Sequence, residues 1–420
     1  MDRALTGAIG TAILLTALTA CSASDVDAAA DAELPACGAA TGEPATGEPI
    51  KIGGISIDVP GLSWTATTST AQAYFDCVND NGGIDGRPIE YVVYHDGTDA
   101  AQTVGLLKQL IETDEVIGMV ANASVMECIA GNGVYQEHGF FSIGEALPID
   151  CFSQTNISPT SASSHASVAA AQVLVEELDV ERIVSVVIQA PGVEQIQALV
   201  EEYGAQQGVE VIPITAPAPI TDAAGLALQV SQAAGEGGGA VLSLGSDGSA
   251  PLLAAAAQQG LVDTVSWACV ALCADPSVVA SLDPAWNGKL HIVSDFALPS
   301  SEGTDNTLLQ AVLAAYAPDL ALNAQANNGF LGAKIAVDVL LGLPDEERTA
   351  EGFNAALSSV TGFESDLLCE PWFFGSGQFH LSNNNVRVVT PQDGVLVDSL
   401  PCFPMAAVPS NHLDEIRSAQ

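Results

Sequence analysis

The amino-acid sequence predicts an α/β protein of two successive lobes, each a sheet of parallel strands covered by helices. Three observations predict this class. The chain has 420 residues, more than one hydrophobic core usually organises. Short apolar segments alternate with longer amphipathic ones, as strands and helices do in βαβ units. A polar stretch at residues 149–165 interrupts the alternation, which then restarts, so a single large sheet is less favoured.

The first run of the alternation lies before this polar stretch. Residues 49–57 (PIKIGGISI) are predicted as a buried strand because apolar residues dominate them. Residues 68–83 are predicted as a helix that stops at Asn81-Gly82-Gly83, since glycine and asparagine favour a helix end. The further elements expected here are strand 87–97, helix 99–114, strand 116–122, helix 124–138 and strand 140–145.

The second run follows the polar stretch and ends in a helical return. Its expected helices are 166–179, 193–208, 223–234 and 250–260, and its expected strands are 182–189, 209–214, 239–245, 264–269 and 289–295. Pro318 should end the first return helix near Ala317. The return comprises helices 307–317, 328–342 and 351–360, followed by a hairpin-like stretch at 377–397.

The N-terminal segment predicts export. Arg3 precedes an apolar run from Leu5 to Ala20 that is shorter than the roughly 20 residues of a membrane span. Residues 1–20 are therefore predicted as a signal peptide. The end of the run, Leu18-Thr19-Ala20-Cys21, resembles the bacterial lipobox, which implies lipidation of Cys21; the alternative is an ordinary secretory signal with an incidental cysteine. Residues 21–49 are predicted as a flexible tether that spans roughly 30 Å.

Composition limits the partners. Ten Lys and Arg residues stand against 51 Asp and Glu residues, a formal net charge of −41. Such a surface repels nucleic acid and anionic lipid headgroups, so neither is an expected partner, and membrane contact is expected only through the N-terminal lipid. A hydrophobic content of 48% is ample for packed cores and argues against global disorder.

The cysteines also suit an exported protein. Nine cysteines less Cys21 leave eight, and an even number predicts disulfide bonds. The sequence does not determine their connectivity. A metal site is not expected, because no CxxC pair occurs. The pairs that we expect are Cys128–Cys151, Cys369–Cys402 and Cys269–Cys273, which leaves Cys37–Cys77.

Residues 79–89 (NDNGGIDGRPI) carry a motif. They resemble the NxxGGIxGRxI element of type I periplasmic solute-binding proteins, in the branched-chain amino acid branch, and the order of elements is similar over residues 50–400. The resemblance implies two Rossmann-like lobes with parallel sheets, joined by a three-segment hinge. The expected boundaries are 50–160 plus 297–343 for the N-terminal lobe, 161–296 plus 344–402 for the C-terminal lobe, and 403–420 for a tail.

The resemblance also implies that a small solute binds between the lobes, outside the carboxyl ends of the strands. Trp64 either stacks on the solute or packs in the core. Ser124 either helps to hold a carboxylate or only caps a helix. Glu145 either pairs with an ammonium group or is a solvated acid. The first-lobe candidates are Ser63, Trp64, Asn122, Ala123, Ser124, Gly144, Glu145 and Ala146.

The second lobe offers fewer candidates. Ser246 and Asp247 follow a strand, and either contact the solute or belong to a turn between two glycines. Phe296 follows the last strand of this lobe and lines either the cleft or the hinge. The resemblance to amino-acid binders implies a second Ser or Thr in the first lobe and a tyrosine in the second. Residues 143–148 (IGEALP) lack the former and the second-lobe loops lack the latter, which disfavours an aliphatic amino acid.

The sequence therefore predicts a lipid-anchored solute-binding protein on the outer face of the cell membrane. We expect a monomer that captures an amino acid, an amide or a related compound by lobe closure and delivers it to an ABC permease. A short peptide or an aromatic compound is an alternative ligand, and a sensory module of the same fold is an alternative role. An enzyme is less favoured: no cofactor is expected, and the sequence has no GxSxG or HExxH motif and only scattered histidines.

Overall fold

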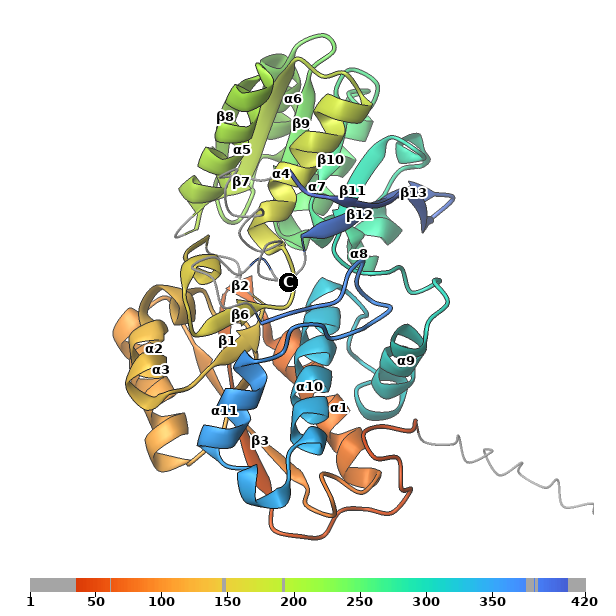
Figure 1. Ribbon diagram of the computed structural model, residues 1–420. Helices are drawn as coiled ribbons and strands as arrows, with labels where there is room; N and C mark the ends of the chain where they lie inside the picture. The colour runs from red at the N-terminus through yellow and green to blue at the C-terminus, as the bar shows by residue number, and fades with distance from the viewer. Residues whose placement is uncertain are drawn as a thin grey trace, which may run out of the picture. The chain divides into compact units, whose positions relative to one another are not determined.

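The computed structural model describes residues 35–60, 62–145, 149–190, 193–374, 381 and 384–406. The described residues belong to one compact unit, which contains two sheets of mostly parallel strands with helices on both faces (Figure 1). The predicted fold class is thereby confirmed. The predicted signal peptide and Cys21 lie outside the described residues. Within the described part, no helix has both the length and the apolar character of a membrane span.

The first sheet is built on parallel strands around β1. The order is β3 (Ile89–Asp96), β1 (Ile50–Val59), β4 (Met119–Asn122), β5 (Ser142–Gly144) and β6 (Ile157–Pro159), and β2 (Leu62–Ser63) runs antiparallel to the end of β1. Apolar residues on opposite faces of the strands require cover on both sides. One face packs against α1 (Thr65–Asp80), α10 (Ala324–Gly342) and α11 (Ala350–Ser358), and the other against α2 (Ala100–Lys108) and α3 (Asn132–His138). The helix α9 (Thr304–Tyr316) packs beside α1. We call this body the first lobe.

The second sheet follows the same plan and ends in a hairpin. Its parallel strands, in order, are β11 (Leu290–Ser294), β10 (Ser266–Cys269), β9 (Gly239–Ser243), β7 (Arg182–Ile188) and β8 (Glu210–Ala216). The antiparallel β12 (Asn385–Gln392) and β13 (Val395–Pro404) continue the sheet beyond β11. The covering helices are α4 (Ala166–Gln172) and α5 (Val193–Gln207) on one face and α6 (Ala223–Ala234) and α7 (Ser246–Gln258) on the other, with the short α8 (Pro276–Ser281) beside α7. This body is the second lobe.

The NxxGGIxGRxI stretch is a tight connection between α1 and β3. The Asn79 side chain donates to the Ile89 carbonyl at 2.8 Å and accepts from the Ile89 N–H at 2.6 Å. Asn79 thus satisfies the backbone at the start of β3. Gly82 and Gly83 have φ values of 101° and 59°, a left-handed conformation that glycine adopts without strain. The residue types of the motif are those that this turn requires.

All four expected disulfides are present. Cys37–Cys77, Cys128–Cys151, Cys269–Cys273 and Cys369–Cys402 are bonded. Cys37–Cys77 corrects the predicted extent of the tether. Cys37 is fully buried against α1, so residues 35–49 belong to the first lobe and not to a flexible segment.

Two other expected boundaries also need correction. Residues 344–374, expected in the second lobe, pack on the first lobe because α11 lies against its sheet. Asn354 of α11 donates to the Ile117 carbonyl at 2.8 Å and accepts from the Phe141 N–H at 2.6 Å, and Phe353 is fully buried in the same core. The predicted C-terminal tail began at residue 403, whereas β13 extends to Pro404. Residues 407–420 of that tail lie outside the described residues.

The chain passes between the lobes at three places, which agrees with the predicted hinge. The first crossing follows β6, the second follows β11, and the third lies between residues 374 and 384, partly outside the described residues. Side chains tie the crossings together. Asp295 of the second crossing accepts from the Ala162 N–H of the first at 2.8 Å, and the Trp372 indole donates to the Pro159 carbonyl at 2.9 Å.

Candidate functional site

The carboxyl ends of the first-lobe strands carry a group of polar, mostly buried side chains beside the hinge. Thr67 comes from the first turn of α1, Glu145 follows β5, and Asn328 lies near the start of α10. Thr160 and Asp295 come from the first two crossings. We call these five residues the edge cluster: Thr67, Glu145, Thr160, Asp295 and Asn328. Such an edge is where ligands bind in open α/β sheets.

Glu145 is placed by the helix that follows β2. The Thr67 hydroxyl donates to Glu145 Oε2 at 2.9 Å, and the Glu145 N–H donates to the Asn122 carbonyl at 2.7 Å. Thr67 itself lies close to α10. A Cβ atom at Gly329 would come within 2.0 Å of the Thr67 carbonyl oxygen, so only glycine allows this approach of the two helices. The packing of α1 on α10 therefore sets the position of the hydroxyl that holds Glu145.

Thr160 links the first crossing to β5 and α10. Its hydroxyl donates to Asn328 Oδ1 at 2.6 Å and lies 3.0 Å from the Gly144 carbonyl, which also accepts from the Thr160 N–H at 2.8 Å. Gly144 cannot carry a side chain, because a Cβ atom there would lie 2.1 Å from the Asn122 carbonyl oxygen. Thr160 and Gly144 therefore fix the backbone that leads into Glu145.

The two acids of the cluster hold protons more tightly than free carboxyls do. Burial raises the pKa of Glu145 from 4.5 to about 7; the Thr67 hydroxyl lowers it in part, and the charge of Asp295 raises it further. Burial likewise raises the pKa of Asp295 from 3.8 to about 6, against the lowering effect of the Ala162 N–H. Desolvation without a neutralising cation is the common cause.

The basic residues of the described part contact other regions. Lys334, for example, pairs with Asp305 and Asp338, and Arg348 pairs with Asp85. None of the ion pairs or hydrogen bonds of the described Lys and Arg side chains involves the edge cluster. The cluster thus offers carboxyl, hydroxyl and amide oxygens, a set suited to an ammonium group or another hydrogen-bond donor.

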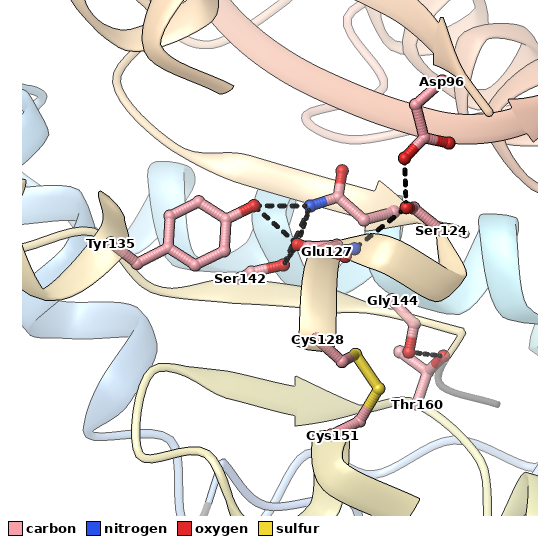
Figure 2. The surroundings of a disulfide bond; sticks show 10 residues. Asp96, Ser124, Glu127, Cys128, Tyr135, Ser142, Gly144, Cys151 and Thr160 are labelled. Carbon is pink, nitrogen blue, oxygen red and sulfur yellow. Dashed lines mark hydrogen bonds between the residues drawn. A yellow bond between two sulfur atoms is a disulfide. The ribbon is translucent and has the colours of Figure 1, made fainter. Parts of the chain in front are cut away.

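Residues 122–124 have hydrogen-bond partners within the chain, and a solute contact of these residues stays a prediction. Figure 2 shows Ser124, Glu127, Tyr135 and Ser142 of the internal network that they join. The Asn122 amide donates to Glu127 Oε1 at 2.6 Å and to Ser142 Oγ at 2.8 Å, and its oxygen accepts from the Ile55 N–H. The backbone N–H and carbonyl of fully buried Ala123 bond to β1. Neither residue has a described donor left for a solute.

Ser124 is a helix cap, the alternative that the sequence analysis kept open. Its hydroxyl accepts from the Glu127 N–H at 3.0 Å and donates to Asp96 Oδ2 at 2.5 Å (Figure 2). Burial raises the pKa of Asp96 above its ordinary value, and the hydrogen bonds from the Ser124 and Thr103 hydroxyls offset part of this rise. Tyr135 also donates to Glu127 at 2.5 Å, so the loop after β4 is held by its own buried polar groups.

The two aromatic candidates serve as packing residues. Trp64 is 8% exposed and packs in a small apolar cluster with Ile57, Val125 and Met126. Phe296 is 3% exposed and belongs to the first-lobe core at the second crossing. Ser63, in contrast, is exposed, and its hydroxyl lies 3.3 Å from that of Thr65. A solute contact of Trp64, Phe296 or Ser63 stays a prediction.

The second-lobe candidates lie at the start of α7. Ser246 donates to the Leu272 carbonyl at 3.3 Å, and Asp247 is exposed in the first turn of the helix. These residues open a helix and not the turn that was the alternative. The solute contacts proposed for Ser246 and Asp247 remain predictions. Ala146 lies outside the described residues.

Four of the five cluster residues were missed by sequence reasoning. Thr160 stands in the polar stretch at 149–165, and Asn328 follows another asparagine at the start of an otherwise apolar helix, which were the available signals. Asp295 adjoins the predicted Phe296. Thr67 gave no signal, because its role depends on the packing of α1 against α10. Within the described ranges, no three His, Cys, Asp or Glu side chains are grouped to hold a metal ion.

Comparisons with solved structures show the same fold. A fatty acid ABC transporter substrate-binding protein from Thermomonospora curvata is similar with a TM-score of 0.71 and 19% identity over 88% of this chain and 96% of that chain. A branched chain amino acid ABC transporter protein from Thermus thermophilus with bound valine has a TM-score of 0.76 and 17% identity over 88% of this chain and 100% of that chain. A solute-binding protein from R. palustris in complex with benzoate has a TM-score of 0.67 and 16% identity over 85% of this chain and 98% of that chain.

A search of curated proteins found no match. The periplasmic binding protein family, however, matches residues 49–394, which is most of the chain and includes the first sheet, the second sheet as far as β12 and all three crossings. The three solved structures match the fold of this chain over nearly their whole lengths. The chain therefore belongs to the periplasmic binding protein family.

Proposed function

We propose that this protein is the extracytoplasmic solute-binding component of an ABC importer, anchored to the outer face of the membrane through a lipid on Cys21. It captures one small polar solute between its lobes and presents it to the permease. Family membership supports an extracytoplasmic binding role. Members of this family bind solutes, and we propose no catalytic step.

One observation carries the proposal: the carboxyl-end loop of a second-lobe strand approaches the first lobe beside the edge cluster. Asp275, which follows β10, accepts from the Asn323 side chain at 3.0 Å, and Asn323 caps α10, the helix that carries Asn328. The carboxyl ends of both sheets thus meet at one place, where a solute is enclosed by both lobes.

The cluster defines the class of solute. Buried Asp295 and half-buried Glu145 have raised pKa values and no basic partner among the described residues, which favours a ligand that supplies positive charge or N–H donors. We propose an amine, an amino acid or an amide, held by Glu145 and Asp295 and by the polar oxygens of Thr160 and Asn328. Simple carboxylates lack such a donor, and we expect them to bind weakly.

A thermal-shift screen tests this proposal. Diamines, amino-acid amides, amino acids and benzoate are compared at equal concentration, because a ligand selective for the folded state raises the melting temperature. We expect stabilisation by at least one nitrogen-bearing class, and its loss in Glu145→Gln but not in the control Glu177→Gln, whose carboxyl is exposed on the second lobe. Stabilisation by benzoate alone, unchanged in Glu145→Gln, would contradict the proposed ligand class.

A further inference from the structure

The disulfide Cys369–Cys402 joins the two lobes. Its cysteines are 33 residues apart in sequence with Cα atoms 5.7 Å apart, and the third crossing lies between them. Each of the other three disulfides has both ends within one lobe. The bond is therefore a fourth covalent connection, in addition to the three crossings of the chain.

The end at Cys369 is firmly part of the first lobe. Leu367 and Trp372 on either side of it are fully buried in the first-lobe core. Phe363 and Trp372 exchange two backbone hydrogen bonds of 2.7 and 2.9 Å, which closes the segment into a hairpin-like loop. Asp366 accepts from two N–H groups at the start of α9, at 2.9 and 3.0 Å. These contacts leave the loop little freedom to move with the second lobe.

The end at Cys402 is equally part of the second lobe. It lies in β13, where the next residue, Phe403, pairs with Val386 of β12. The neighbour Arg387 of β12 pairs in turn with Ser294 of β11. Any relative rotation of the lobes must therefore keep Cys369 and Cys402 within bonding distance, unless the disulfide is broken.

This disulfide is also the accessible one. Cys37, Cys77, Cys128, Cys151, Cys269 and Cys273 are each at most 1% exposed, whereas Cys402 is exposed and Cys369 is partly exposed. Arg387 Nη2 lies 3.9 Å from Cys369 Sγ. A guanidinium at this position stabilises a Cys369 thiolate, which makes that sulfur the better leaving group when a thiol attacks Cys402.

We propose that Cys369–Cys402 is a redox modification site at which a dithiol reductant releases the two lobes from one another. One thiolate of the reductant attacks Cys402 Sγ, the Cys369–Cys402 bond breaks, and Cys369 leaves as a thiolate beside Arg387. The second thiol of the reductant then resolves the mixed disulfide. The protein gains two thiols and the reductant becomes a disulfide, so two electrons and two protons are transferred. The oxidised bond limits the opening of the lobes, and the reduced pair permits a wider range.

Pulse reduction tests the accessibility of this bond. Free thiols are first blocked with N-ethylmaleimide; the purified protein then receives a short dithiothreitol pulse, is alkylated with iodoacetamide and is mapped by mass spectrometry. We expect alkylation of Cys369 and Cys402 at least about tenfold faster than that of the other six half-cystines. Equal rates at all eight, or faster labelling of Cys128 and Cys151, would overturn the assignment. An Arg387→Gln variant should slow the reaction at Cys369–Cys402.

X-ray scattering tests the mechanical consequence without any ligand, so its outcome is independent of the proposed function. The radius of gyration should rise by roughly 1 Å from about 21 Å when this bond alone is opened, by pulse reduction or in Cys369→Ser/Cys402→Ser. The matched control Cys37→Ser/Cys77→Ser removes a bond within one lobe and should leave the radius unchanged. An unchanged radius after pulse reduction, or equal expansion of the control, would refute the proposal. Pulse-reduced wild-type protein decides the question if the double variant does not fold.

Discussion

Replacing Glu145 with Gln should stabilise the protein at alkaline pH and flatten the dependence of its stability on pH. The folded-state pKa of Glu145 is about 7, raised above the ordinary value of 4.5. A carboxyl whose pKa is raised by folding contributes stability that is complete below the unfolded-state pKa and is lost as the pH rises through the folded-state pKa. The window of this loss therefore runs from about pH 4.5 to about pH 7.

The magnitude follows from the shift. A rise from 4.5 to about 7 corresponds to about 3 kcal/mol at about 1.4 kcal/mol per pH unit. Part of this cost already applies at pH 5, so the variant should gain about 2 kcal/mol more at pH 8 than at pH 5. Gln keeps an oxygen that accepts from the Thr67 hydroxyl, so the hydrogen bond is not a confounding loss.

Urea unfolding at pH 5 and pH 8 measures this difference for the wild type, Glu145→Gln and the exposed control Glu177→Gln. Only the cluster variant should show a gain that grows with pH. Asp295, whose pKa is about 6, remains in the variant and leaves a residual dependence of the same sign. An equal gain at both pH values, or a net loss at pH 8, would show that the desolvation argument for Glu145 is wrong.

Three further predictions concern the anchor and the packing. Cys21→Ser should release the protein from membranes, and fractionation that still finds it in the membrane pellet would contradict the lipid anchor. Gly329→Ala should lower the free energy of unfolding, measured by urea titration, by about 1–3 kcal/mol because its Cβ would overlap the Thr67 carbonyl. The control Gly342→Ala on the same helix places its Cβ where no atom lies within 4 Å, so it should leave the free energy of unfolding unchanged. Trp64→Ala should lower the free energy of unfolding by about 3 kcal/mol in the same assay, because Trp64 is nearly buried. An unchanged urea midpoint would show that Trp64 does not contribute to the packing.

The sequence was sufficient to predict the helices and strands, but it was insufficient to assign some of them to the correct lobe. Periodicity predicts α11 because it is amphipathic, but nothing in Phe353 or Asn354 says which sheet the helix covers. In the structure, the Asn354 amide hydrogen-bonds to the backbone of Ile117 and Phe141, which assigns the helix to the first lobe. Such a match between distant segments depends on the folded arrangement and leaves no periodic pattern in the chain.

The candidate site shows the same limit in a different form. The rule that polar residues after parallel strands face the ligand selects the region of Glu145, where a solute contact stays a prediction. It could not separate Glu145 from Asn122, because both follow strands and both are polar. The difference is that Asn122 bonds to Glu127 and Ser142, a network whose members lie 5 and 20 residues away in sequence. Both N–H groups of the Asn122 amide are used within the chain, whereas a carboxylate such as that of Glu145 has two oxygens and can accept further hydrogen bonds.

Asp295 connects the site with the hinge. Its carboxylate accepts from the Ala162 N–H and so holds the second crossing to the first, while its charge raises the pKa of Glu145. A cationic group bound between the two acids would offset the cost of their burial, with an attraction of about 4 kcal/mol for each charge at about 4 Å near a protein surface. This gain requires the crossings to keep Asp295 beside Glu145. Under the proposed function, Asp295 therefore takes part both in solute capture and in the geometry of the hinge.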